Sequence, residues 1–130
     1  MATALDDYAI HQIVENMDLV EGRNPRWTDE VWFHAGSADG KINISAYIGV
    51  YPQTATMDAA VSVVIGGKQY NVRASRIVNG DRDTKQVDCI SAEIIEPFEE
   101  WQFIVEEKEN QPISLKISFK SLNQPIEVSA

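Results

Sequence analysis

Apolar and polar residues alternate along most of the chain after residue 30, which is the pattern of half-buried β-strands. The pattern predicts eight short strands, at residues 30–35, 41–51, 57–65, 68–75, 86–95, 101–107, 113–122 and 126–129. Turn signals such as Asp39-Gly40 and Gly66-Gly67 separate them. Short strands spaced about 8–12 residues apart are typical of an antiparallel sandwich or barrel, so we expect an all-β fold.

In the first part of the chain the apolar residues recur with a different period. Apolar residues recur at helical spacing through residues 1–20, and Asp6 and Asp7 would favour the positive end of a helix dipole. A loop with Gly22 and Pro25 follows. We therefore expect an N-terminal arm over residues 1–24, helical or coiled, and one β-domain over residues 25–130.

Two predicted strands have unusual polar faces. Residues 41–51 place Tyr47 and Tyr51 among small polar side chains, and residues 30–35 place Glu30, Trp32 and His34 together opposite an apolar face. In a closed barrel, such a mixture would line a ligand-filled lumen. The alternative is that the aromatic residues form a cross-strand cluster at the surface or a subunit contact.

Glu30 and His34 are the best candidates for acid–base chemistry. In a strand they would lie on one face about 13 Å apart, and could flank a ligand with Trp32 as an apolar floor between them. A carboxylic acid beside an indole in a dry cavity can donate a proton near neutral pH. The alternative is that Glu30 forms an ion pair with Arg73 or Arg76.

Charge and composition limit the classes of partner that the chain can bind. The chain has 130 residues with 11 Lys+Arg against 20 Asp+Glu, a formal net charge of −9. This acidic balance argues against nucleic acid and against an anionic membrane surface. No apolar run approaches the roughly 20 residues of a membrane span. The N-terminus lacks the basic start of a secretory signal, so we expect a cytoplasmic protein.

Few residues are available for metal or thiol chemistry. His11 and His34 are the only histidines, and the single Cys89 permits no intrachain disulfide. Cys89 lies in a predicted strand without a neighbouring cation, which favours a packed thiol over a nucleophile. The sequence also lacks phosphate-binding glycine motifs. We therefore expect no metal and no cofactor.

Four motifs then occur in a familiar order. They are PRWTDEVWF at 25–33, KINISAYIGVYP at 41–52, YNVRASR at 70–76 and EIIEPFEEWQF at 93–103. The ordered set resembles the lipocalin-like family of AttH and the carotenoid 1,2-hydratases (hydroxyneurosporene synthases), over roughly residues 25–125. The resemblance implies a calycin-like antiparallel barrel or sandwich. Family proteins usually contain two β-domains, and this chain matches only the N-terminal one.

The resemblance also implies a function. Family members bind or act on terpenoid-, carotenoid- or polyketide-like molecules, with hydration, isomerisation or cyclisation through proton donation. Glu30 falls on the motif glutamate, Trp27 and Trp32 on its aromatics, and Trp101 on a later tryptophan. Together with the strand faces, this gives Glu30 and His34 as expected catalytic residues. The expected ligand-binding residues are Trp27, Trp32, Tyr47, Tyr51, Arg73 and Trp101.

The missing second domain implies a partner. We expect a homo-oligomer, or a hetero-oligomer in which another chain supplies the second β-domain. The alternative to an enzyme is a non-catalytic ligand-binding domain or an accessory subunit that completes a partner's active site.

Overall fold

The computed structural model describes residues 3–8, 26, 28–78 and 84–126. The strands are β1 (Asp29–Gly36), β2 (Ile42–Tyr51), β3 (Thr56–Ile65), β4 (Lys68–Ile77), β5 (Gln86–Val87), β6 (Ile90–Glu96), β7 (Glu100–Val105) and β8 (Leu115–Lys120). Two short 3-10 turns, η1 (Ala4–Asp7) and η3 (Pro52–Thr54), complete the regular structure of these ranges.

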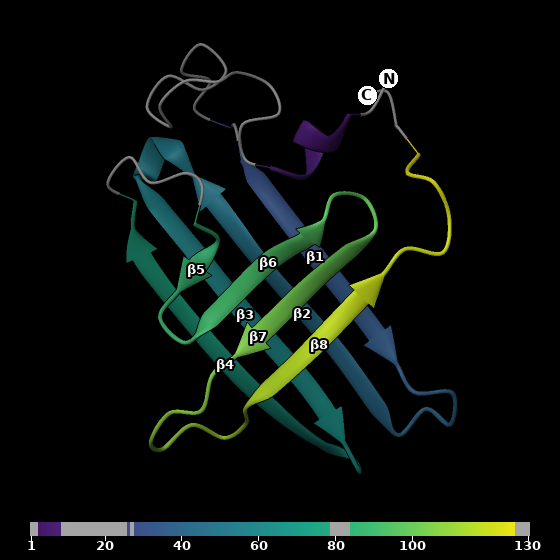
Figure 1. The fold of residues 1–130 in the computed structure, drawn as a ribbon. Helices are drawn as coiled ribbons and strands as arrows, with labels where there is room; N and C mark the ends of the chain where they lie inside the picture. Colours follow the sequence, from purple (N-terminus) through teal and green to yellow (C-terminus); the bar gives the residue numbers. More distant parts are fainter. Residues whose placement is uncertain (1–2, 9–25, 27, 79–83, 127–130) are drawn as a thin grey trace.

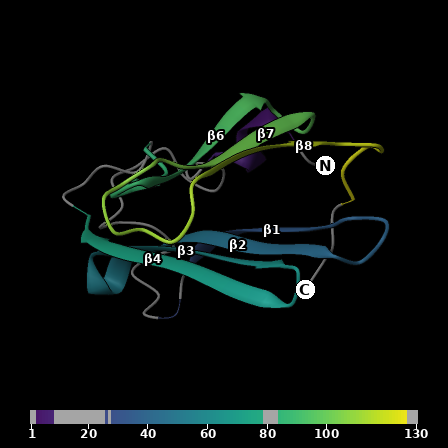
Figure 2. The same ribbon diagram turned by 90° about the horizontal axis from the view of Figure 1, so that it is seen from below.

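The strands form two antiparallel four-stranded sheets, with the orders β1-β2-β3-β4 and β5-β6-β7-β8. The second sheet lies across the first, with its strands running at an angle to the strands below (Figure 1). Seen from another side, the two sheets are separate layers (Figure 2). The fold is therefore an all-β sandwich, which confirms that alternative, and the sheets do not close into a barrel.

Most of the predicted strands are present with shifted ends, but the one predicted at residues 86–95 is divided. The chain turns at Asp88 and Cys89, where Asp88 adopts a φ of +53°, so β5 and β6 pair with each other as a tight hairpin. Ile126, the described part of the last predicted strand, is not in a strand. Of the predicted N-terminal helix, residues 4–7 form the single turn η1, and residues 9–20 lie outside the described residues.

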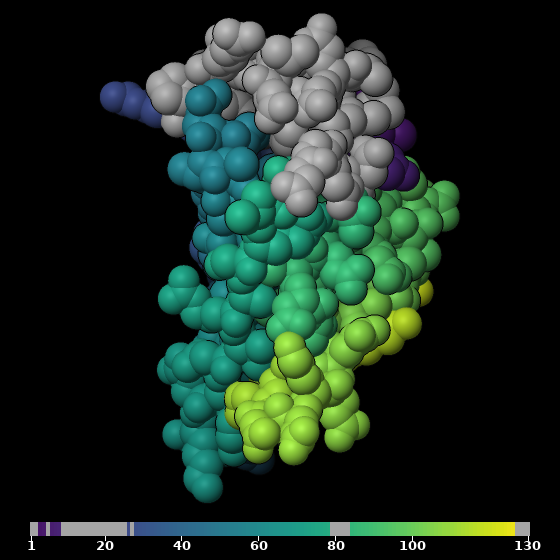
Figure 3. Space-filling view, turned by 90° about the vertical axis from the view of Figure 1, so that its left-hand side faces the viewer, coloured from purple at the N-terminus to yellow at the C-terminus, as the bar shows by residue number. Residues whose placement is uncertain are grey.

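The space between the layers is filled by apolar side chains. The largest of those less than 2 % exposed are Phe103, Ile48, Met57, Ile90, Val50, Val61, Val87 and Val105, which come from both sheets. Figure 3 views the β4 and β5 side of the molecule, where atoms of the two layers meet. The prediction of a ligand-filled lumen inside a barrel is therefore wrong, because the space between the two sheets is a packed core.

An aromatic cluster joins the two layers. The Phe33 ring of β1 lies 5.8 Å from the Trp101 ring, 5.5 Å from Phe103 and 4.8 Å from Phe119, measured between centroids. These tilted contacts between large apolar rings are favourable beyond the area they bury. They hold β1 against β7 and β8 of the second sheet.

A buried ion pair makes a second connection between the layers. Lys85, just before β5, places its Nζ 3.6 Å from the Asp29 carboxylate at the start of β1, and the two side chains are 7 % and 11 % exposed. The same Nζ lies 5.9 Å from the Trp101 ring. Trp101 also contacts η1: the Asp7 carboxylate accepts hydrogen bonds from the indole Nε1 at 3.1 Å and from the Phe98 backbone N–H at 2.6 Å.

Candidate functional site

The outer face of sheet β1–β4, the face turned away from the second sheet, collects most of the predicted site residues. The alternation of β1 points Phe33 into the core, where it is 6 % exposed, and Trp32 outward, where it is 55 % exposed. The register then aligns Trp32, Tyr47, Ala60 and Arg73 in one row across the four strands. Six predicted residues share this outer face: Glu30, Trp32, His34, Tyr47, Tyr51 and Arg73.

Three rings on the outer face are stacked. The Trp32 and Tyr47 rings lie 4.8 Å apart between centroids with an angle of 22° between their planes. The His34 ring is nearly parallel to Trp32, at 5° and 6.3 Å. This matches the alternative in which the aromatic residues form a cross-strand surface cluster. The stack keeps a large indole in a defined orientation at the surface.

Glu30 fixes the position of Trp32 further. Its Oε2 accepts a hydrogen bond from the Trp32 Nε1 at 3.1 Å, and its Oε1 accepts one from the Tyr51 hydroxyl at 2.8 Å. Burial of Tyr51, with its bond to Glu30, raises the pKa of the Tyr51 hydroxyl, so it stays a donor. The alternative ion pair of Glu30 with Arg73 or Arg76 is not formed. Arg76 instead donates to backbone oxygens of Gln86 and Thr84.

Gly49 makes this arrangement possible. It lies opposite Glu30 in the register of β1 and β2. A Cβ at this position would lie 3.0 Å from the Glu30 Cγ and 3.0 Å from the Tyr51 Oη, closer than side chains normally pack. The glycine therefore leaves the space through which the tyrosine reaches the carboxylate.

A slot runs beside the ring stack and has a volume of about 250 Å³. Trp32 and Tyr47 form one wall, and Asn71 and Arg73 of β4 form the other. Small residues form the floor: Ser45, Ala60 and Ser62. A second hollow of about 390 Å³, lined by His34, Asn43 and Val64 among others, shares Ser45 and Ser62 with the slot.

Arg73 is the cationic side chain that lines the slot. Its side chain is exposed, and within the described ranges nothing forms an ion pair or a side-chain hydrogen bond with it. Lys85, by contrast, pairs with Asp29 in the interior. The outer face therefore presents an unpaired guanidinium beside an aromatic wall, on a chain with a net charge of −9.

Two predicted site residues are not brought to this face. Trp101 lies between the layers, where it packs on Phe33 and donates to Asp7, so its position is structural. Trp27 lies outside the described residues. Sequence reasoning also did not single out Asn71 or the slot serines as site residues. The alternation placed Asn71 on the face of Arg73 and Ser45 on the face of Tyr47, but only the pairing register brings these faces and Ser62 together.

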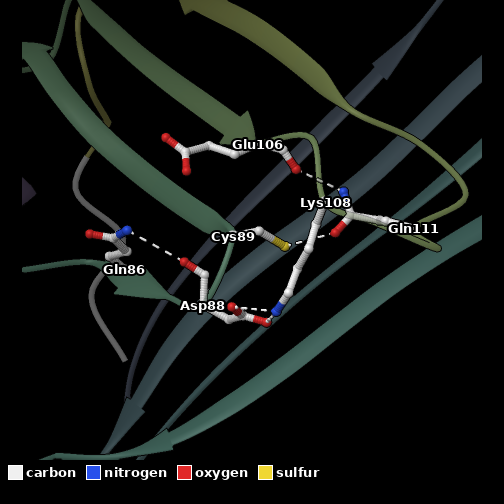
Figure 4. A network of polar contacts seen from close by, with 6 residues as sticks. All are labelled: Gln86, Asp88, Cys89, Glu106, Lys108 and Gln111. Carbon is white, nitrogen blue, oxygen red and sulfur yellow. Dashed lines mark hydrogen bonds and ion pairs between the residues drawn. The ribbon is translucent and has the colours of Figure 1, made fainter.

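The thiol of Cys89 belongs to a turn and is remote from the slot residues in the sheet order. Figure 4 shows its surroundings: Cys89 donates to the Gln111 side chain at 2.9 Å, and Lys108 pairs with Asp88 at 2.6 Å. Burial raises the pKa of the Cys89 thiol, with the Asp88 charge as the next cause. The residue is a buried, protonated thiol, as a structural cysteine would be.

The described part of the chain holds no group of three or more His, Cys, Asp or Glu residues placed to bind a metal ion. Likewise, none of its helices has the length and apolar character needed to cross a bilayer.

The fold and the outer face together define a small antiparallel β-sandwich with an open, aromatic-walled slot on one sheet. The chain belongs to the DUF8625 family, described as a family of unknown function, whose model matches residues 2–129. No curated protein and no solved structure shows a significant match to the chain.

Proposed function

We propose that this chain is a non-catalytic small-molecule-binding domain that holds one ring of its ligand in the slot on the outer face. The observation that carries the proposal is the Trp32–Tyr47 stack, in which a 55 % exposed indole is held by ring stacking and a hydrogen bond beside a recess with a small-residue floor. Rigid aromatic side chains that remain exposed are a common means of contacting ligands and partners.

The hydrogen bonds of Glu30 support a positioning role for this residue. Both carboxylate oxygens are occupied as acceptors, by the Trp32 indole and the Tyr51 hydroxyl. A proton donor to substrate would need a free hydroxyl directed at the ligand. We therefore assign Glu30 to orienting the indole, and His34 to the end of the ring stack. Hydration, isomerisation or cyclisation stays a prediction from the family resemblance.

The adjoining hollows support ligands longer than one ring. They share Ser45 and Ser62, so a molecule with its ring in the slot could continue along the sheet toward Asn43. The terpenoid-, carotenoid- or polyketide-like ligands expected from the resemblance would lie across this open face instead of inside a barrel.

Binding of 2-naphthol to the full chain, followed by backbone amide NMR shifts, tests the proposal. We expect shifts concentrated on the four strands around Ala60, and a loss of affinity of at least about tenfold in Trp32→Ala. The matched control is Ile77→Ala, which removes another exposed apolar side chain, 72 % exposed, from the end of β4. Equal binding by the two variants, or shifts spread away from the slot, would contradict the proposal. Circular dichroism checks that both variants fold.

A further inference from the structure

The chemistry of the slot walls narrows the class of ligand. Resting on the binding role proposed above, we infer that the slot takes a planar aromatic ring bearing a carboxylate, with the ring against Tyr47 and the carboxylate on the Arg73 guanidinium. No other cationic side chain lines the slot among the described residues, so one negative charge is the complement of its lining.

The width of the slot fits a single ring. Tyr47 and Arg73 lie in one row of the sheet with only Ala60 between them. Two strand spacings separate their backbones by about 9.6 Å. Ring–ring contacts occur at centroid distances of about 4.5–7 Å, and a cation lies within about 6 Å of a ring that it contacts. A ligand ring placed over Ala60 can therefore contact both walls at once.

The volume of the slot also indicates a small ligand. At about 250 Å³, the slot is smaller than the pockets that bury drug-sized ligands, which begin near 300 Å³. A molecule of one or two fused rings fills it. Ser45 and Ser62 on the floor, with Asn71 on the wall, leave hydrogen-bonding groups for polar substituents on the ring.

The charge of the ligand follows from Arg73. Among the described residues Arg73 forms no ion pair, and unlike Lys68 and Lys116, which also form none, it lines the slot. The Glu30 carboxylate lies three strands away on β1 and is engaged on both oxygens, and the nearer carboxylate of Asp58 on β3 forms no ion pair with Arg73. Guanidinium groups bind carboxylates through two parallel hydrogen bonds, and a stacked arginine can contact a ring at the same time.

The test compares 2-naphthoate with its neutral analogue 2-naphthol, and with methyl glucoside as a non-aromatic ring, on the full chain. We expect 2-naphthoate to bind at least about tenfold more tightly than 2-naphthol. Arg73→Gln should lower the affinity for 2-naphthoate by roughly 10- to 100-fold and change the affinity for 2-naphthol less than about twofold. The affinity of Arg73→Lys for 2-naphthoate should lie between those of the wild type and Arg73→Gln, because lysine keeps the positive charge but lacks the planar guanidinium that makes two parallel hydrogen bonds.

Lys68→Gln is the matched control. It removes the same charge from the same strand, at a position whose alternation places it on the opposite face from Arg73, and it should change 2-naphthoate binding less than about twofold. If 2-naphthol binds as tightly as 2-naphthoate, or Arg73→Gln has no effect, the inferred class is wrong while the binding role stands. Preferential binding of the glucoside would also overturn the class. If neither naphthalene compound binds, the binding role itself fails.

Discussion

The ion pair between Lys85 and Asp29 allows a sharp test of how the two sheets are held together. The partners come from different layers, and their side chains are 7 % and 11 % exposed. The Asp29 Oδ2 that faces Lys85 is fully buried and accepts no hydrogen bond. Replacing Lys85 with Met keeps most of the side-chain volume and removes the only charge that compensates this oxygen among the described residues.

The expected loss is large. At the observed separation of 3.6 Å, an effective dielectric constant near 20 gives an attraction of about 5 kcal/mol. Breaking a buried pair from one side typically destabilises a protein by about 3–5 kcal/mol, because the remaining charge is left without compensation. Single domains unfold with free energies of only about 5–15 kcal/mol. Lys85→Met should therefore remove a major part of the stability of this chain.

Urea unfolding of four proteins measures the effect: the wild type, Lys85→Met, Asp29→Asn and the double variant. We expect the double variant to recover most of the loss, to within about 1–2 kcal/mol of the wild type, since no unpaired charge remains. A loss below about 1 kcal/mol for Lys85→Met would refute the reasoning. So would a double variant whose loss equals the sum of the single losses, because the two charges would then not interact.

Three further outcomes follow from the structure. Gly49→Ala should weaken binding of ring compounds several-fold by displacing Glu30 and Tyr51, whose atoms lie 3.0 Å from the new Cβ; unchanged affinity in a titration would contradict the role of this glycine. Phe103→Ala should lower the unfolding free energy by about 3–5 kcal/mol in urea, because the ring is 0 % exposed. The pKa of Tyr51 is raised by burial and by Glu30, so the folded state keeps a proton that the unfolded state loses. Stability should therefore fall as the pH rises above about 10, and Tyr51→Phe should reduce that slope in unfolding experiments at several alkaline pH values.

Which residues of one strand share a face could be predicted from the sequence, because side chains alternate between the two faces along a strand. Glu30, Trp32 and His34 were correctly grouped on one face of β1, and Tyr47 with Tyr51 on one face of β2. Whether those faces point inward or outward could not be predicted, since both faces of the first two strands carry large apolar groups. The inward direction is taken by Phe33, which has ring partners in the second sheet.

Other features depend on long-range pairing or on unusual local geometry. The slot exists because Ala60 falls between Tyr47 and Arg73, and this requires the register of three strands. The division of the strand predicted at 86–95 depends on Asp88 in a left-handed conformation, without the glycine that normally signals it. The resemblance placed Trp101 in the site, but its partners Phe33 and Asp7 come from distant parts of the chain.

Sheet β1–β4 uses the same strands for folding on one side and for the slot on the other. Tyr47 is flanked in β2 by the buried Ala46 and Ile48, and Trp32 is followed by the buried Phe33. An enlarged or shortened interior side chain would therefore tilt the backbone that carries the slot walls. The proposed ligand affinity would therefore be coupled to the thermodynamic stability of the domain, and substitutions in the core would change the selectivity of the slot without contacting a ligand.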